Sequence, residues 1–149
     1  LIPYYKILSI YHLNNTYLGM ILVYTSFTIP FCTWMMVGFF KSIPLEVDEA
    51  AIIDGCSRLK VFFRIILPLT LPGIAAAAIY SFNTSWNEYM FAQILINDPG
   101  LKTVPVGIAE LNGQYKMAAS LISSIPLVLL FLFFQRSFIS SLTAGAVKQ

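Results

Sequence analysis

A short polar group interrupts an apolar stretch of the sequence and offers side chains suited to contact a solute. It consists of Asn83, Trp86, Asn87 and Glu88. Sugar rings stack on an indole, their hydroxyls hydrogen-bond to carboxamides, and an ionisable group in a membrane segment usually faces a bundle interior or a water-filled path. If this stretch crosses a membrane, we predict that the group lines a translocation path. The alternative is that Glu88 lies near the membrane interface or pairs with another helix.

A second, charged group is concentrated in residues 41–68, between two long apolar runs. This segment carries half of the charged residues of the chain: Lys41, Glu46, Asp48, Glu49, Asp54, Arg58, Lys60 and Arg64. A polar segment between two membrane-length runs is expected to be a loop on one aqueous side. Within it, Glu49 is predicted to pair with a basic residue of a partner protein or to stay a solvated helix charge. The basic residues near its end are predicted to contact lipid headgroups.

The turn signals in this segment predict a folded helix–turn–helix. Pro44 suits the first turn of a helix, where its missing N–H has no consequence. Helix-forming residues continue to Asp54, and Gly55 then supplies the left-handed residue that ends helices. Ser57 can cap a second helix, which is expected to end near Pro68.

Other kinds of chemistry have little support in the sequence. His12 is the one histidine and has no cysteine nearby, so a metal site is not expected. Cys32 and Cys56 lie in different environments and do not suggest a disulfide. The chain contains neither a Gly-x-Ser-x-Gly elbow nor a phosphate-binding Gly-x-x-x-x-Gly-Lys loop. We therefore expect no enzymatic activity and no cofactor, and any use of ATP would need a separate ATPase.

Composition places the elements in a membrane. Of 149 residues, 58% are hydrophobic and only 11% are charged, which a soluble domain rarely shows. Long apolar runs, of which the second contains the single acid Glu88, predict three membrane-spanning helices at about 18–40, 69–96 and 117–135, with a partly helical loop at 97–116. Pro30 and Pro126 fall within spans, where prolines are tolerated. Gly73 and Ala77 form a small-xxx-small pair that would allow close helix packing.

The distribution of Lys and Arg predicts the orientation. Six lie on the side of the charged loop (Lys41, Arg58, Lys60, Arg64, Arg136 and Lys148) and three on the other (Lys6, Lys102 and Lys116). The positive-inside rule therefore places the charged loop and the C-terminus in the cytoplasm. A net charge of +2, without a basic cluster interleaved with aromatics, gives no support for nucleic-acid binding.

The charged loop resembles the EAA signature of membrane subunits of bacterial ATP-binding cassette (ABC) importers. The resemblance rests on Glu49, Ala50, Ala51, Asp54, Gly55, Ile65, Leu67 and Pro68. It implies that these residues form the coupling element that docks in a cleft of the ATP-binding subunit. Further similarity, at Asn15–Tyr17, at the Trp86-Asn87 pair and in the Gln135–Lys148 ending, is with the carbohydrate-uptake branch and its maltose-transporter-type, six-span subunit.

The resemblance implies an all-α, polytopic transmembrane helical bundle. We expect residues 1–149 to be a single permease domain, N-terminally truncated and holding three of six spans. Its implied partners are a dimer of cytoplasmic ATP-binding subunits, a second permease subunit, an extracytoplasmic solute-binding protein and the lipid bilayer. The implied location is the bacterial inner membrane. Two alternatives stay open: an amino-acid or peptide permease of the same class, and a membrane anchor or assembly subunit that does not transport.

Overall fold

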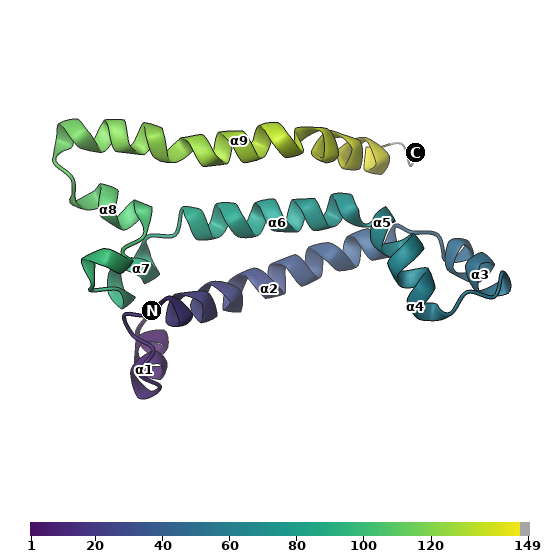
Figure 1. Cartoon of the computed structure of the whole chain (residues 1–149), viewed down its shortest axis with the longest axis horizontal. Coiled ribbons are helices and arrows are strands. Elements are labelled where there is room, and N and C mark those ends of the chain that lie inside the picture. The colour runs from purple at the N-terminus through teal and green to yellow at the C-terminus, as the bar shows by residue number, and fades with distance from the viewer. Residues whose placement is uncertain (147–149) are drawn as a thin grey trace. The chain divides into compact units, whose positions relative to one another are not determined.

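The computed structural model describes residues 1–146, including the side chains of residues 1–134. The side chains of Arg136 and Lys148, which enter the charge count, and the tail from Leu142 lie outside the described side chains. The described chain is helical and contains no strand, which confirms the all-α class (Figure 1). Its elements in order are α1 (Ile2–Ile10), α2 (Tyr17–Lys41), α3 (Leu45–Ile53), α4 (Arg58–Val61), a π-helical turn η1 (Phe62–Ile66), α5 (Leu67–Leu69), α6 (Leu71–Trp86), α7 (Met90–Leu95), a 3₁₀ turn η2 (Pro99–Leu101), α8 (Val104–Glu110) and α9 (Gly113–Ala146).

Two of these helices are long and apolar enough to cross a membrane by themselves: α2 and the described part of α9, Gly113–Phe134. The first coincides with the span predicted at 18–40. The second begins before residue 117, so the end of the predicted loop at 97–116 is already helical. A third span exists if the segment Arg58–Leu69 and the helix α6, which meet at a bend of 66°, are counted together.

The prediction of one continuous helix over residues 69–96 is wrong. The chain bends at Thr70, between α5 and α6, and α6 ends at Trp86 before the short helix α7 begins. Pro72 explains the first interruption, because a proline in the first turn of α6 has no N–H to continue the preceding hydrogen-bond ladder. The second interruption lies at residues 87–89, which contain no helix-breaking proline or glycine.

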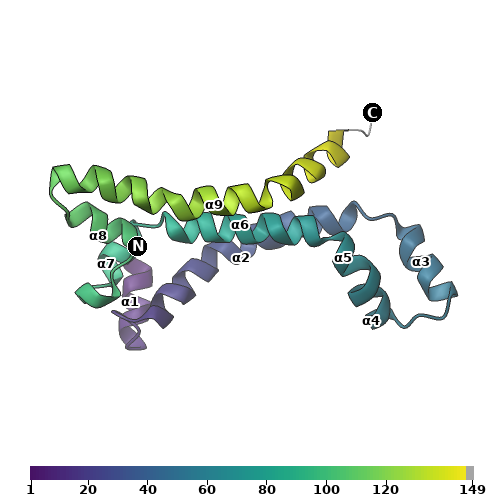
Figure 2. The same ribbon diagram turned by 45° about the horizontal axis from the view of Figure 1, so that its top comes forward.

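The chain divides into two compact units, and the first comprises Leu1–Pro30 and Ser81–Leu130. In this unit α1, α7 and α8 gather around the N-terminal end of α2 (Figures 1 and 2). We call this arrangement the α1–α7–α8 cluster. Its buried apolar side chains are Leu8, Met20, Val23, Ala92, Leu95, Ile96 and Val106. The burial of this core comes from segments far apart in the sequence.

The second unit comprises Phe31–Tyr80 and the described residues from Phe131 onward. Here α2 and α6 pack against each other in antiparallel fashion. Gly73 is buried against the ring of Phe39, and the thiol of Cys32 donates to the carbonyl of Ala77 at 3.7 Å. The predicted close packing at Gly73 and Ala77 is therefore confirmed, since small residues at both positions let the helices approach.

Candidate functional site

The turn after α3 has the geometry that the sequence predicted. Gly55 has a φ of +82°, a left-handed conformation that glycine adopts without steric penalty. The N–H of Gly55 donates to the carbonyl of Ile52 at 2.9 Å, and the N–H of Cys56 donates to the carbonyl of Ala51 at 3.1 Å. This pair of bonds is the Schellman motif, which satisfies carbonyls at the end of a helix. The turn is therefore built by local backbone bonds that require a residue with positive φ.

The two helices on either side of the turn begin close to the predicted positions. Pro44 precedes α3 by one residue, as its N-terminal cap. Glu46 and Asp48 lie in the first turn of α3, where negative charge is favoured by the helix dipole. Ser57 is the N-cap of α4, but its hydroxyl makes no capping hydrogen bond. The helix–turn–helix prediction is confirmed.

The helix α3 presents both a carboxylate and apolar side chains to its surroundings. Glu49 and Ala50 are exposed, whereas Ala51 is buried. Leu45 is 76% exposed and Ile53 is 85% exposed, at the two ends of the same helix. Among the described side chains, Glu49 forms no ion pair. A short helix with exposed apolar ends and a free carboxylate is suited to dock into a cleft of another protein.

The remaining residues of the EAA resemblance lie after the turn, in a helix that changes its winding. Ile65 belongs to the π-helical turn, and Leu67 and Pro68 begin α5. The helix passes Pro68 and ends at Leu69, one residue beyond the predicted end. The buried Thr70 closes it, because its backbone N–H donates to the carbonyl of Ile66 and its hydroxyl donates to that of Leu67, both at 3.0 Å.

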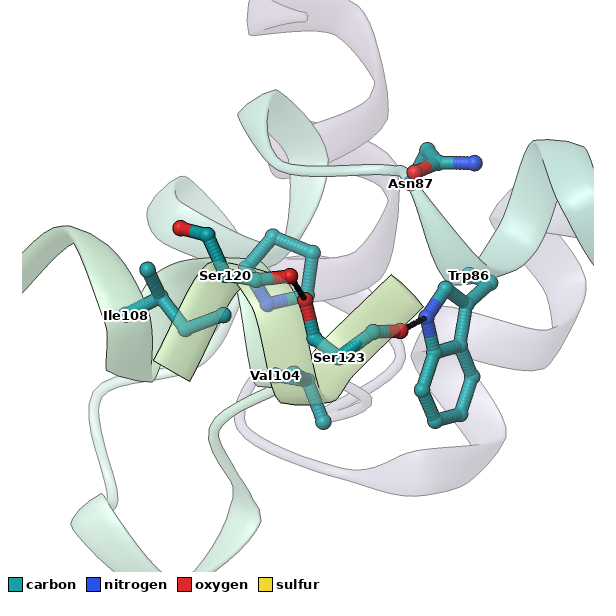
Figure 3. Close-up of a pocket in the computed structure, with 7 residues that line it drawn as sticks. Trp86, Asn87, Val104, Ile108, Ser120 and Ser123 are labelled. Carbon is teal, nitrogen blue, oxygen red and sulfur yellow. Dashed lines mark hydrogen bonds between the residues drawn. The ribbon is translucent and has the colours of Figure 1, made fainter. Parts of the chain in front are cut away.

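The residues predicted to line a path have different structural roles. Trp86 connects α6 to α9, and the two asparagines bond to each other. The indole N–H of Trp86 donates to the backbone carbonyl of Ser123 at 3.0 Å (Figure 3). The same indole stacks on Phe82, with ring centroids 5.3 Å apart. Asn87 donates to the backbone carbonyl and the side-chain oxygen of Asn83 at 2.8 and 2.9 Å. Both asparagines are exposed, so their remaining polar atoms are accessible.

Glu88 has a different environment from the one predicted. It lies in the break between α6 and α7 and not inside a membrane helix. Its carboxylate accepts hydrogen bonds from the backbone N–H groups of Phe91 and Ala92, at 2.8 and 3.1 Å. It also accepts from the hydroxyl of Tyr24 on α2, at 3.0 Å. Glu88 therefore caps the first turn of α7, which the sequence did not predict, and ties it to another helix, as the stated alternative for Glu88 allowed.

A pocket of about 230 Å³ adjoins part of this group, and Figure 3 shows residues that line it. Its lining combines the indole and an amide with apolar and hydroxyl side chains: Trp86, Asn87, Val104, Pro105, Ile108, Ser120 and Ser123. Of the four predicted path residues, the pocket thus brings together Trp86 and Asn87, while Asn83 and Glu88 are not in its lining. Among the described residues, no cluster of three or more His, Cys, Asp or Glu side chains could hold a metal ion.

Asn15 entered the sequence analysis only through the resemblance at Asn15–Tyr17, which did not predict that its side chain joins the turn before α2 to the loop after α7. Its side-chain oxygen accepts from the N–H groups of Asn97 and Asp98 at 2.9 and 2.8 Å, and its own N–H donates to the carbonyl of Leu95 at 2.9 Å. Asn15 has a φ of +59°. Asparagine tolerates this region better than most residues, so the Asn-Asn sequence at 14–15 was the available signal.

An α-helical chain that combines apolar membrane-length helices with an exposed, charged helix–turn–helix is typical of an integral membrane protein. Over residues 2–143 the chain matches the family described as binding-protein-dependent transport system inner membrane component. The chain belongs to this family. Its members are membrane components of transport systems, not enzymes.

Three relatives illustrate the similarity. The chain is 37% identical over 154 positions to the sulfoquinovosyl glycerol transport system permease protein SmoH of Agrobacterium fabrum, covering 99% of this chain and 54% of that protein. It is 43% identical over 141 positions to the trehalose/maltose transport system permease protein MalG of Thermococcus litoralis, covering 90% and 51%. It is 34% identical over 153 positions to the diacetylchitobiose uptake system permease protein DasC of Streptomyces coelicolor, covering 99% and 55%. The chain spans about half the length of the curated relatives it matches.

Proposed function

We propose that this chain forms part of the permease subunit of a binding-protein-dependent ABC importer that translocates a carbohydrate or polyol-type solute. The observation that carries the proposal is the family match over residues 2–143, which includes the helix–turn–helix with Gly55 at its turn. The names of the relatives support the solute class, since they refer to a sulfoquinovosyl glycerol, to trehalose and maltose, and to diacetylchitobiose.

Energy would reach the membrane helices through the segment from α3 to α5. In this proposal α3 docks in a cleft of a separate ATP-binding subunit, with Leu45 and Ile53 as its apolar anchors and Glu49 paired to a basic residue. The Schellman turn at Gly55 fixes the direction in which α4 leaves α3. When two ATP-binding subunits close on ATP, α3 moves with them and α4 and α5 transmit the displacement to α6. ATP hydrolysis thus belongs to the partner subunit.

The proposed orientation follows from the position of the ATP-binding subunit. The segment from α3 to α5, which we call the coupling segment, and the C-terminus face the cytoplasm, and the chain lies in the inner membrane of a bacterium. A second permease subunit supplies the other half of the path, and an extracytoplasmic binding protein delivers the solute. Within this chain, Trp86 and Asn87 line the pocket of about 230 Å³ and are the proposed contacts to solute. Asn83 orients Asn87, and Glu88 holds the start of α7 in place.

Substitutions in the turn test the coupling proposal in the full-length permease, expressed with its neighbouring transport subunits. Gly55→Val places a β-branched residue at φ +82°, a backbone conformation that costs an L-residue about 1–2 kcal/mol of conformational free energy. The added side chain causes no clash at its first carbon, because no atom lies within 4 Å of the added Cβ. Glu49→Lys reverses the exposed charge of α3. Gly55→Asn is the matched control, because asparagine tolerates the left-handed region.

We expect both test variants to insert into the membrane normally but to lose solute uptake and co-purification of the ATP-binding subunit. The Asn control is expected to keep both. Normal uptake in Gly55→Val and Glu49→Lys would overturn the coupling role. If the wild-type permease co-purified with no ATP-binding subunit, the chain would be a membrane anchor. A bound amino acid or peptide on the companion binding protein would change the solute class alone.

A further inference from the structure

The segment Arg58–Leu69 carries two neighbouring rows of exposed side chains. Leu59 and Phe63 form an apolar row and are 73% and 62% exposed. Lys60 and Arg64 form a basic row beside it and are also exposed. Residues four apart share one face of a helix, so each row is continuous. On the other side of the same helix, Val61 is fully buried.

The basic row has no carboxylate partner within the described chain. The ion pair between described side chains joins Lys102 to Glu110, far along the sequence from this segment. Lys60 and Arg64 therefore present unpaired positive charge beside an apolar surface. Amphipathic helices that lie in a membrane interface have this composition, with apolar side chains toward the acyl chains and cations at the level of the phosphates.

The bend at Thr70 places the segment at a suitable depth. Its 12 residues span about 18 Å at a rise of 1.5 Å per residue. Because its axis makes an angle of 66° with that of α6, it advances only about 7 Å along the α6 direction. Figure 2 shows α4 and α5 turning away from the line of α6. A helix connected in this way to a membrane helix runs close to the membrane surface.

The lengths support the same placement. The 16 residues of α6 cover about 24 Å, somewhat less than the hydrocarbon thickness of about 30 Å. The advance of about 7 Å made by Arg58–Leu69 supplies the difference. The apolar residues next to Thr70 then fall at the edge of the hydrocarbon region, and Arg58 and Lys60, at the far end, reach the headgroups.

We propose that Arg58–Leu69 is an interfacial helix that binds anionic phospholipid through Lys60 and Arg64 while Leu59 and Phe63 enter the acyl boundary. Two observations favour lipid over an acidic surface of a protein partner. The segment is separated from a membrane helix by a single residue, Thr70, and an apolar row accompanies the cations. This binding surface is distinct from α3, the proposed docking helix for the ATP-binding subunit.

A fluorophore on the apolar row tests the proposal in the full-length permease, reconstituted with its transport partners in nanodiscs. Phe63→Cys, in a background with Cys32→Ser and Cys56→Ser, is labelled with bimane. Brominated phosphatidylglycerol and brominated phosphatidylcholine then serve as quenchers. We expect quenching by both lipids and stronger quenching by phosphatidylglycerol. Removing both cations with Lys60→Gln and Arg64→Gln should lower the preference by about fivefold per cation while leaving quenching by phosphatidylcholine intact.

Controls separate lipid from the other occupants of this surface. Lys6→Gln removes a cation from the other unit and should change neither signal, and Arg64→Lys should keep most of the preference. If neither lipid quenched the fluorophore, the apolar row would face water, and the proposal would be overturned. Quenching that occurs in nanodiscs holding the permease subunits alone but is absent from the assembly with the ATP-binding subunit would assign the surface to that protein and also overturn the proposal. If the Gly55 variants contradicted the coupling proposal, these fluorescence results would be unaffected, so the two proposals can fail separately.

Discussion

A single methyl group added at Gly73 should measure how tightly α2 and α6 are packed. The Cβ of an alanine there would lie 2.5 Å from Cγ, 2.6 Å from Cδ2 and 3.0 Å from Cβ of Phe39. Rotation of the ring cannot remove all three contacts, since the Cβ of Phe39 is fixed to the backbone of α2. The helices must separate or shift, and such overpacking costs about 1–3 kcal/mol.

Gly38, the residue before Phe39, provides a control for helix propensity. A Cβ at Gly38 would meet no atom within 4 Å, so Gly38→Ala should raise the free energy of unfolding by about 1 kcal/mol, the difference in helix propensity between glycine and alanine. Gly73→Ala gains the same difference but loses the packing. We therefore expect Gly73→Ala to have a free energy of unfolding about 1–3 kcal/mol below that of Gly38→Ala, with the clash as the cause.

The assay is the free energy of unfolding of the full-length permease in bicelles, measured by steric trapping. Phe39→Ala in the background of Gly73→Ala completes a double-mutant cycle. Removing the ring abolishes the contacts of 2.5 and 2.6 Å and leaves only the contact of 3.0 Å with the Cβ of residue 39, so the alanine at position 73 should be less destabilising in this background. Equal stabilities of Gly73→Ala and Gly38→Ala, or additive effects in the cycle, would refute the close contact between these helices.

Two further predictions concern hydrogen bonds of the α1–α7–α8 cluster. Asn15→Ala removes the acceptor for Asn97 and Asp98 and places alanine at φ +59°, a loss of about 2–3 kcal/mol. Hydrogen exchange at the two amides should accelerate, while Asn15→Gly, which relieves the strain but lacks the acceptor, should recover only part of the protection. Glu88→Ala leaves three donors without an acceptor and should destabilise the protein by about 2–4 kcal/mol, whereas Tyr24→Phe should lose about 1 kcal/mol. Because Glu88 acts as a cap, thermal unfolding should shift in both variants while the KM for solute stays unchanged; a large rise in KM would instead assign Glu88 to the path.

The helix–turn–helix was predictable because its signals are local. A left-handed glycine, a proline before a first turn and a serine before the next helix each act within a few residues. The structure places Gly55 at φ +82° and puts Pro44 and Ser57 at N-caps. Docking of α3 to an ATP-binding subunit, in contrast, depends on a partner and stays a prediction.

The region after α6 was not predictable, because hydropathy does not distinguish a membrane helix from a helix buried in protein. Ala92, Leu95 and Ile96 continue the apolar run, but they are buried in the α1–α7–α8 cluster together with Leu8. That burial depends on a segment more than 80 residues earlier in the chain. The partners of Glu88 were hidden for the same reason, since Tyr24 lies 64 residues away.

The hydrogen bonds of Asn15 also constrain the stage of biogenesis at which the α1–α7–α8 cluster can fold. Asn15 and Asp98 are 83 residues apart, and α2, the coupling segment and α6 all lie between them. The N-terminal part emerges first during synthesis, so Asn15 waits without these partners until the intervening helices have entered the membrane. Closure of such a long loop is slow compared with helix formation. The α1–α7–α8 cluster is therefore a late product of biogenesis, and its protection against proteolysis would report that the preceding helices have been inserted in the correct order.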